Sequence, residues 1–245
     1  MPKTIAIIQA RMGSTRLPGK ILMDIQGHPM LWHIIERVKQ AKLIDAIIVA
    51  TSDNKIDDPL EKYLESIGVY FYRGSEDNVL ERFYEASLLC GAETIVRLTG
   101  DNCLIDPNII DSTILYFKDT KFRYVSNIKQ PSAKCTFPVG VACEVFTFEL
   151  LDEAYHKAKE SYEKEHVTPY MYYQQKSIGC YSNHIDLSNY RFTVDTLEDY
   201  EYIKVIYRYF FKGEHDFYLN DIIRFLKEHP EIAELNTNAE QKKVK

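Results

Sequence analysis

The chain has 245 residues, of which 45% are hydrophobic and 27% charged, as expected for a globular protein with one sizeable core. Its 30 basic and 36 acidic side chains give a formal net charge of −6, which argues against nucleic acid as the main partner. The five cysteines form no C-x-x-C pair, and no signal peptide or membrane-spanning run is visible, so we expect a cytoplasmic protein with reduced thiols and no membrane partner.

The first predicted strand is the apolar run at residues 4–8, and the loop that follows it carries the strongest functional signal. Residues 7–20 read I-I-Q-A-R-M-G-S-T-R-L-P-G-K, which places Arg11, Arg16 and Lys20 among small and turn-forming residues. Backbone N–H groups of such a loop can turn toward an anion, and these cations add partners for phosphate oxygens. The loop matches neither G-x-x-x-x-G-K-[ST] nor G-x-G-x-x-G. We predict a polyphosphate site; the alternative is a surface loop with solvated charges.

Strands and helices then alternate through the first half of the chain. Helices are predicted at residues 29–41, 59–67 and 77–90 and from 106 onward, and strands at 46–50, 69–72 and 94–98. This alternation predicts an α/β domain with a mostly parallel sheet. Ligands of such sheets bind beyond the carboxyl ends of the strands. The loops at 9–20, 51–54 and 99–103 are therefore expected to face one site.

The pattern changes in the second half. Strands are predicted at residues 124–127, 140–148 and 177–182, helices at 149–159, 165–175, 196–211 and 219–227, and a polar tail at 236–245. Many of the eighteen tyrosines fall in this half. These polar-tipped aromatic side chains are too numerous for one core, which predicts that some of them cover an interface.

Five motifs follow one another along the chain: Q-A-R-M-G-S-T-R-L-P-G-K at 9–20, V-A-T-S at 49–52, R-L-T-G-D at 97–101, E-H-V-T-P-Y at 165–170 and F-T-V-D-T-L-E-D at 192–199. Their order resembles that of the CTP-dependent sugar-acid cytidylyltransferases, such as the CMP-Kdo and CMP-sialic acid synthetases, and most of all the spore coat polysaccharide biosynthesis protein F-like members. The resemblance implies a Rossmann-like nucleotide-diphospho-sugar transferase (GT-A-like) fold. It implies one domain over residues 1–235, with an acceptor and dimerisation region at 124–183, and hence a homodimer.

The resemblance also implies the reaction. CMP would pass from CTP to an anionic acceptor, a sugar acid, with release of pyrophosphate, in the synthesis of surface polysaccharide or glycoconjugate. Lys20, Arg11 and Asp101 are the expected catalytic residues. The expected nucleotide-binding residues are Gln9, Ala10, Arg11, Gly13, Ser14, Arg16, Lys20, Thr51, Ser52, Asp53 and Arg97. Ser75, Glu76 and Asn78 are further candidates for contact with the cytosine edge.

Two aspartates are the expected ligands of Mg²⁺. Asp101 follows a glycine at a strand end, and Asp195 precedes the last long helix. Two carboxylates with phosphates and water would provide the oxygen ligands that this ion prefers. The alternatives are a turn aspartate at position 101 and a helix cap at position 195, where Glu198 follows three residues later.

The expected acceptor contacts are Asn127, Glu144, Glu165 and His166, with Lys129 and Lys134 nearby. For His166 the alternative is an ordinary packed histidine. Ala142 stands where the spore-coat-like relatives usually carry an aspartate, so the acceptor of this chain can differ from theirs.

Two other functions compete with this interpretation. A glycosyltransferase that consumes a nucleotide sugar usually carries D-x-D, which is absent near Asp101. A nucleotide-binding protein without catalysis would need the basic loop but not the two aspartates, and this chain has both.

Overall fold

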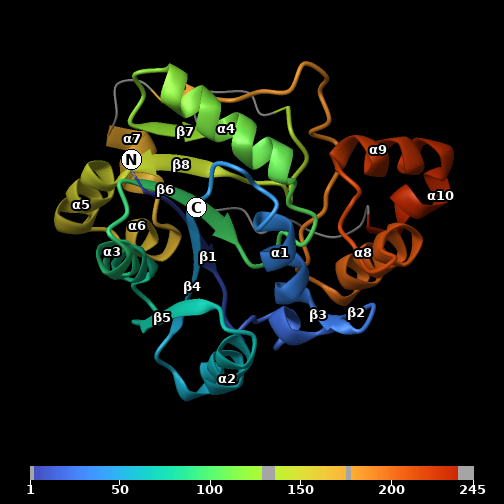
Figure 1. Cartoon of the computed structure of the whole chain (residues 1–245), viewed down its shortest axis with the longest axis horizontal. Coiled ribbons are helices and arrows are strands. Elements are labelled where there is room, and N and C mark those ends of the chain that lie inside the picture. Colours follow the sequence, from blue (N-terminus) through green and yellow to red (C-terminus); the bar gives the residue numbers. More distant parts are fainter. Residues whose placement is uncertain (1–2, 129–135, 175–177, 237–245) are drawn as a thin grey trace.

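A mixed sheet forms the centre of the protein. The computed structural model describes residues 3–128, 136–174 and 178–236, so the expectations for Lys129, Lys134 and residues 237–245 lie outside it. The sheet has the order β5 (Tyr70–Gly74), β4 (Ala46–Ser52), β1 (Thr4–Gln9), β6 (Thr94–Thr99), β8 (Glu144–Thr147), β7 (Tyr124–Ser126) and β9 (Gly179–Cys180) (Figure 1). Neighbours from β5 to β6 are parallel, whereas β8 is antiparallel to β6 and β7. The predicted α/β class is confirmed.

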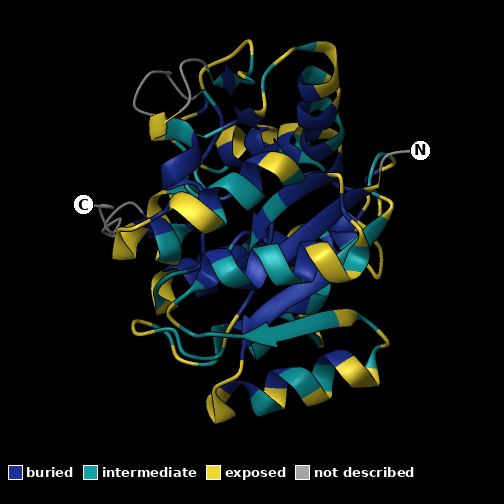
Figure 2. Ribbon diagram, turned by 90° about the vertical axis from the view of Figure 1, so that its left-hand side faces the viewer, coloured by how far each residue is buried: buried dark blue, intermediate teal, exposed yellow. Residues whose placement is uncertain are grey.

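Helices cover both faces of the sheet, because the central strands carry apolar side chains on both faces. One buried cluster joins the sheet to α1 (Met30–Val38), α2 (Asp58–Ser66), α4 (Pro107–Asp119), α8 (Leu197–Phe210) and α9 (Leu219–Glu228). The other joins it to α3 (Val79–Cys90), α5 (Phe148–Lys157) and α7 (Pro169–Gln174). Figure 2 shows the buried strands between helices with exposed outer sides. Within the described ranges, no helix has the length and apolar character required to cross a membrane.

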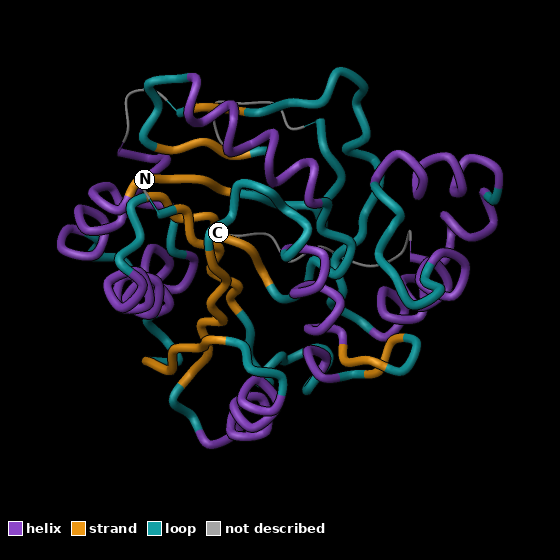
Figure 3. The backbone as a smooth tube through the Cα atoms, viewed as in Figure 1, coloured by secondary structure: helices purple, strands orange, loops and turns teal. Residues whose placement is uncertain are grey.

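Several short elements lie outside the predicted pattern. The hairpin of β2 (Asp24–Ile25) and β3 (His28–Pro29) stands apart from the main sheet (Figure 3). Its turn residues Gln26 and Gly27 both have positive φ, as in the tight turns that suit a two-residue hairpin. The other unpredicted elements are α10 (Pro230–Ala233) and the 3₁₀ turns η1 (Lys20–Leu22), η2 (Lys55–Asp57) and η3 (Glu234–Asn236).

Three predictions for the second half were wrong in their bounds. The helix expected at 165–175 is two helices, α6 (Ser161–His166) and α7, because Val167 has φ 69° and Pro169 cannot continue a helix. The strand expected at 140–148 is only β8, since Thr147 already caps α5 through Leu150 N. The strand expected at 177–182 is, within the described residues, only β9.

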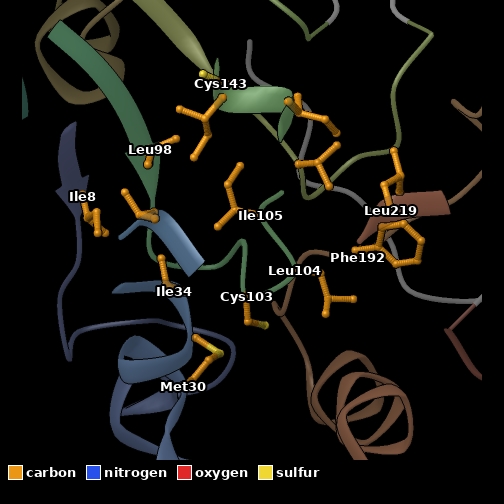
Figure 4. Packing of buried hydrophobic residues seen from close by; sticks show 14 of the residues in the cluster. Ile8, Met30, Ile34, Leu98, Cys103, Leu104, Ile105, Cys143, Phe192 and Leu219 are labelled. Carbon is orange, nitrogen blue, oxygen red and sulfur yellow. The ribbon is translucent and has the colours of Figure 1, made fainter. Parts of the chain in front are cut away.

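The segment after β6 is anchored in the core, which fixes the strand-end residues before it. Cys103, Leu104 and Ile105 are fully buried. In Figure 4 they lie between Met30 and Ile34 of α1 and Phe192 from the segment before α8. The loop that carries Asp101 is therefore held by packing from both the N-terminal and the C-terminal halves of the chain.

A close backbone approach holds the segment before α8 against the loop that precedes β8. Gly140 has φ 104°, and a Cβ built on it would lie 2.5 Å from the Phe192 carbonyl carbon and the Thr193 nitrogen. Gly213 has nearly the same φ, 105°, but a Cβ there meets nothing within 4 Å. Only Gly140 therefore requires glycine for space as well as for conformation.

We predict that Gly140→Ala lowers the free energy of unfolding by at least about 2 kcal/mol more than Gly213→Ala does, because both strain the backbone but only the first overlaps other atoms. Urea unfolding of the two variants measures the difference. Equal losses would show that the Gly140–Phe192 contact relaxes without cost.

A buried histidine pair links the β2–β3 hairpin to the loop after α8. His33 Nε2 lies 2.7 Å from the Ile25 carbonyl oxygen, so it carries the proton, and His33 Nδ1 accepts from His215 Nε2 at 2.8 Å. Burial, which outweighs the Ile25 hydrogen bond, lowers the pKa of His33 to about 4. Burial and the charge of Arg37 lower the pKa of His215 to about 3. Both rings are therefore neutral at neutral pH.

These lowered pKa values predict a loss of stability in mild acid. Below pH 6.5 the unfolded chain binds protons that the folded chain does not, so the free energy of unfolding falls as the pH drops from 6.5 toward 4. The expected slope is up to about 1.4 kcal/mol per pH unit for each histidine. Urea unfolding between pH 7 and 5 measures it, with His156→Gln at an exposed position as a control that keeps the slope. A flat profile would contradict the neutral pair.

Candidate active site

A pocket of about 310 Å³ opens at the carboxyl ends of β1 and β6. Parallel strands place the loops that follow them at one edge of the sheet, which is where the sequence predicts the ligand. The pocket is lined by Gln9, Ala10, Arg11, Ser14, Thr15, Arg16, Lys20, Ile21, Arg97, Thr99, Gly100, Asp101, His166 and Asp195. Four cations and two carboxylates thus share one cavity.

The basic loop is fixed by its own turns and by a buried aspartate. The Ser14 and Gly19 N–H groups both donate to the Met12 carbonyl oxygen at 2.9 Å. The Met12 N–H donates to Asp57 Oδ1 at 2.6 Å, and the Ser52 N–H and hydroxyl donate to Asp57 Oδ2. Asp57 is only 1% exposed. The loop is therefore held in place before any ligand arrives, through a residue that no sequence motif marks.

Asp195 is the centre of the ionic network in the pocket. Its carboxylate lies 3.1 Å from Lys20 Nζ and 3.0 Å from a guanidinium nitrogen of both Arg16 and Arg191. Arg191 also pairs with the buried Asp199 at 3.2 Å. Burial would raise the pKa of Asp195, but the charge and hydrogen bond of Lys20, with Arg191 and Arg16, hold this pKa below its ordinary value. Asp195 is therefore ionised at neutral pH.

Asp101 lines the same cavity and stands two residues after the end of β6. The residue between them, Gly100, has no room for a side chain. A Cβ on Gly100 would lie 2.9 Å from the Gln9 carbonyl oxygen. The Thr99 hydroxyl donates to Asp101 Oδ1 at 2.5 Å, and the Val194 N–H donates to the Asp101 carbonyl oxygen at 3.0 Å. That main-chain bond places the two predicted metal-binding segments side by side.

The donor set at this point fits Mg²⁺. This ion takes oxygen ligands, and it usually combines one or two carboxylates with phosphates and water. Asp101 and Asp195 both line the pocket. Within the described ranges, no group of three or more His, Cys, Asp or Glu side chains is placed to hold a metal by itself. The two aspartates thus fit an ion that arrives with a phosphate ligand better than a closed metal site.

Arg97 and Glu144 form a second ion pair, on the β8 side of the pocket. The two residues are register partners on β6 and β8. Glu144 is 2% exposed and also accepts from the Tyr124 and Thr168 hydroxyl groups. Arg97 donates to Gln9 Oε1 at 3.3 Å as well. A fully partnered buried carboxylate thus holds a guanidinium at the pocket wall, and His166 lines the same cavity.

The structure brings most of the predicted residues together, but not all of them. Thr51 and Ser52 are buried beneath the loop and do not line the pocket. Gly13 and Asp53 are not among the lining residues either. Asn127 is buried and bonds the main chain of Val141 and Cys143, and Glu165 is exposed beside the lining residue His166.

Sequence reasoning did not single out several residues that line or support the site, among them the lining residues Ile21, Thr99 and Gly100 and the five named next. Arg191 stands four residues before Asp195, a spacing from which an ion pair could have been predicted. Asp57, Tyr124 and Thr168 act through contacts with residues that are distant in sequence. The fifth, Thr15, stands inside the recognised loop.

The Asp195 network predicts competition between this carboxylate and anionic ligands for the same cations. Asp195→Asn removes the negative charge from Lys20 and Arg16, so the affinity for tripolyphosphate without metal should rise at least about fivefold. Titration calorimetry measures it, with Asp53→Asn at an exposed position outside the pocket as the control. Unchanged or weaker binding by Asp195→Asn would mean that Asp195 does not shield the loop.

Known proteins resemble this chain over part or nearly all of its length. A family model described as cytidylyltransferase matches residues 5–241. The chain is 35% identical over 246 residues to the spore coat polysaccharide biosynthesis protein SpsF of Bacillus subtilis, covering 95% of this chain and 98% of that protein. It is 39% identical over 109 residues to the 3-deoxy-manno-octulosonate cytidylyltransferase of Geobacter sulfurreducens, covering 44% and 43% of the two chains.

A solved structure extends the likeness over the whole chain. The cytidylyltransferase from Leptospira borgpetersenii superposes with a TM-score of 0.88 at 34% identity and covers 100% of both chains. The resemblance drawn from the motifs and the nucleotide-diphospho-sugar transferase fold that it implies are thereby confirmed. This chain belongs to the cytidylyltransferase family.

Proposed function

We propose that the protein transfers CMP from CTP to an oxygen of a sugar acid and releases pyrophosphate, in a reaction that requires Mg²⁺. The observation that carries the proposal is that a preformed basic loop and two aspartates line the same pocket. A free triphosphate needs both, because its charge must be neutralised and its reacting phosphorus held in line. The name of the Geobacter relative supports a sugar acid as the class of acceptor.

In this reaction an acceptor hydroxyl oxygen forms a bond to the α-phosphorus of CTP. The bond from that phosphorus to the oxygen bridging to the β-phosphate breaks, pyrophosphate leaves with the electron pair, and the hydroxyl proton is lost. Lys20, Arg16 and Arg11 line the pocket as partners for the triphosphate oxygens. Lys20 is the best placed to stabilise the developing charge, since Val194 O and Asp195 hold its ammonium group at the pocket wall.

Asp101 and Asp195 would hold Mg²⁺. When bound, this ion neutralises phosphate charge and stabilises the leaving group. The chain's own contribution is to keep the Asp195 carboxylate ionised through the cations around it, and to hold its segment beside Asp101 through the main-chain bond from Val194 to Asp101.

The acceptor would lie on the β8 side of the pocket. Arg97 is held there by Glu144, and it can pair with the carboxylate of a sugar acid, with His166 as a further polar contact. Glu144 itself is buried and fully engaged, so its proposed role is to position Arg97. A homodimer in the cytoplasm fits this function, and the exposed Tyr162 and Tyr173 beside α6 and α7 fit an interface there.

Pyrophosphate release tests the proposal. We expect Mg²⁺-dependent release with CTP, and not with ATP, GTP or UTP, when the right acceptor from a panel of sugar acids is present. Lys20→Met and Asp101→Asn should each lower kcat/KM at least about 100-fold, because each removes charge stabilisation at the transferred group. Lys55→Met, an exposed lysine outside the pocket, is the matched control and should leave the rate unchanged.

Two results would contradict the proposal. One is turnover that survives Lys20→Met. The other is a wild-type protein that binds CTP but releases no pyrophosphate with any acceptor in the panel, which would favour a nucleotide-binding protein.

A further inference from the structure

Arg82, near the start of α3, is a buried cation whose guanidinium group has no hydrogen-bond partner among the described residues. It is 1% exposed, and within the described part of the chain none of its three guanidinium nitrogens has a hydrogen-bond partner. Burial, with the nearby charge of Arg11, lowers the pKa of Arg82 to about 10, so the group is still charged at neutral pH. An unpaired buried charge is strongly unfavourable, which suggests that its partner arrives from outside the chain.

Arg37 shows how this protein satisfies a buried arginine that serves the fold. It is fully buried, and its Nε donates to the Ile105 carbonyl oxygen at 2.6 Å while Nη2 donates to the Phe217 carbonyl oxygen at 2.9 Å. Its guanidinium also lies 4.6 Å from the centre of the Phe217 ring. Among the residues that the structure describes, Arg82 has neither a hydrogen bond to its guanidinium nor a ring beneath it, so the two arginines form a natural pair for comparison.

Arg82 lies where the basic loop meets the β5–α3 loop. Its Cγ would be 3.0 Å from a Cβ on Gly74. Glu76, in the β5–α3 loop, accepts from Arg11 at 3.5 Å and from Asn54 Nδ2 at 2.7 Å. These contacts connect the β5–α3 loop to the basic loop. Since Arg11 lines the pocket, Arg82 is placed behind the pocket wall, on the β5 side and away from the acceptor side at β8.

The charges around Arg82 select the kind of group that can reach it. Asp57, Glu76 and Asp53 all act on Arg82 electrostatically. Three carboxylates disfavour a phosphate at this place, whereas a neutral ring with both acceptors and donors suits a guanidinium beside carboxylates. Cytosine has two adjacent acceptors, O2 and N3, which match two parallel N–H groups of a guanidinium. Its amino group can donate a hydrogen bond to a carboxylate. Uracil has a donor at N3 instead.

We propose that Arg82 recognises the O2–N3 edge of the cytosine ring and thereby determines the preference for CTP over UTP. The Arg11–Glu76 contact, which is half-exposed, opens to admit the base, and Glu76 then accepts from the cytosine amino group. This inference rests on the proposed function, because it assumes a nucleoside triphosphate in the pocket.

The test compares Arg82→Met with Arg37→Met. Calorimetry gives the affinities for CTP and UTP and hence the CTP-to-UTP affinity ratio, pyrophosphate release shows whether UTP becomes a substrate, and thermal unfolding without ligand gives stability. We expect Arg82→Met to lower the CTP-to-UTP ratio at least about tenfold without lowering the Tm, because it removes an unpaired charge. Arg37→Met should lower the Tm and keep the ratio.

An unchanged CTP-to-UTP ratio in Arg82→Met would overturn the inference, as would a loss of Tm equal to that of Arg37→Met, which would assign Arg82 to the fold. Failure of the proposed function is distinguishable. If the wild type releases no pyrophosphate with any triphosphate, that function fails, and the binding ratio from calorimetry still decides the role of Arg82.

Discussion

The ion pairs of Asp195 are the interaction on which the site depends. They join Lys20 and Arg16 of the first loop to a carboxylate that stands 175 residues after Lys20 along the chain. Each side stabilises the charge of the other: the carboxylate gives Lys20 and Arg16 a counter-charge in the absence of an anion, and these cations keep the partly buried carboxylate ionised. Arg191, which shares Asp195 and Asp199, keeps the network attached to α8.

The sheet makes this contact possible. β1 and β6 are parallel neighbours, so the basic loop and the Asp101 loop leave the same edge. Gly100 lets the main chain after β6 pass close to Gln9, and Gly140 lets the segment before α8 lie against the loop that precedes β8. At both positions a side chain would overlap other atoms. Gly100 directly precedes Asp101, and the residues that pass close to Gly140, Phe192 and Thr193, shortly precede Asp195. The fold therefore positions carboxylates mainly through close backbone approach.

The sequence was sufficient for the α/β class and for the pocket residues that stand at strand ends. Arg11, Arg16, Lys20 and Asp101 could be predicted because strand-end loops converge whatever their length. Asp57 and Thr168 could not, since they act through contacts that only the folded chain creates. The break between α6 and α7 has a local cause, the positive φ of Val167 and the ring of Pro169, but the helical pattern on both sides of it favours one continuous helix in the sequence. Arg82 could not be predicted either, because its burial and the absence of hydrogen-bond partners among the described residues appear only in the folded chain.

Mg²⁺-dependent binding of CTP tests the central claim most directly. Titration calorimetry of the wild type and of Asp101→Asn, each with and without Mg²⁺, separates the basic loop from the two carboxylates. If the loop and the aspartates form one site for a metal-bound triphosphate, Mg²⁺ will strengthen CTP binding to the wild type and will not do so in Asp101→Asn. Equal affinity of the wild type for CTP with and without Mg²⁺ would contradict the claim.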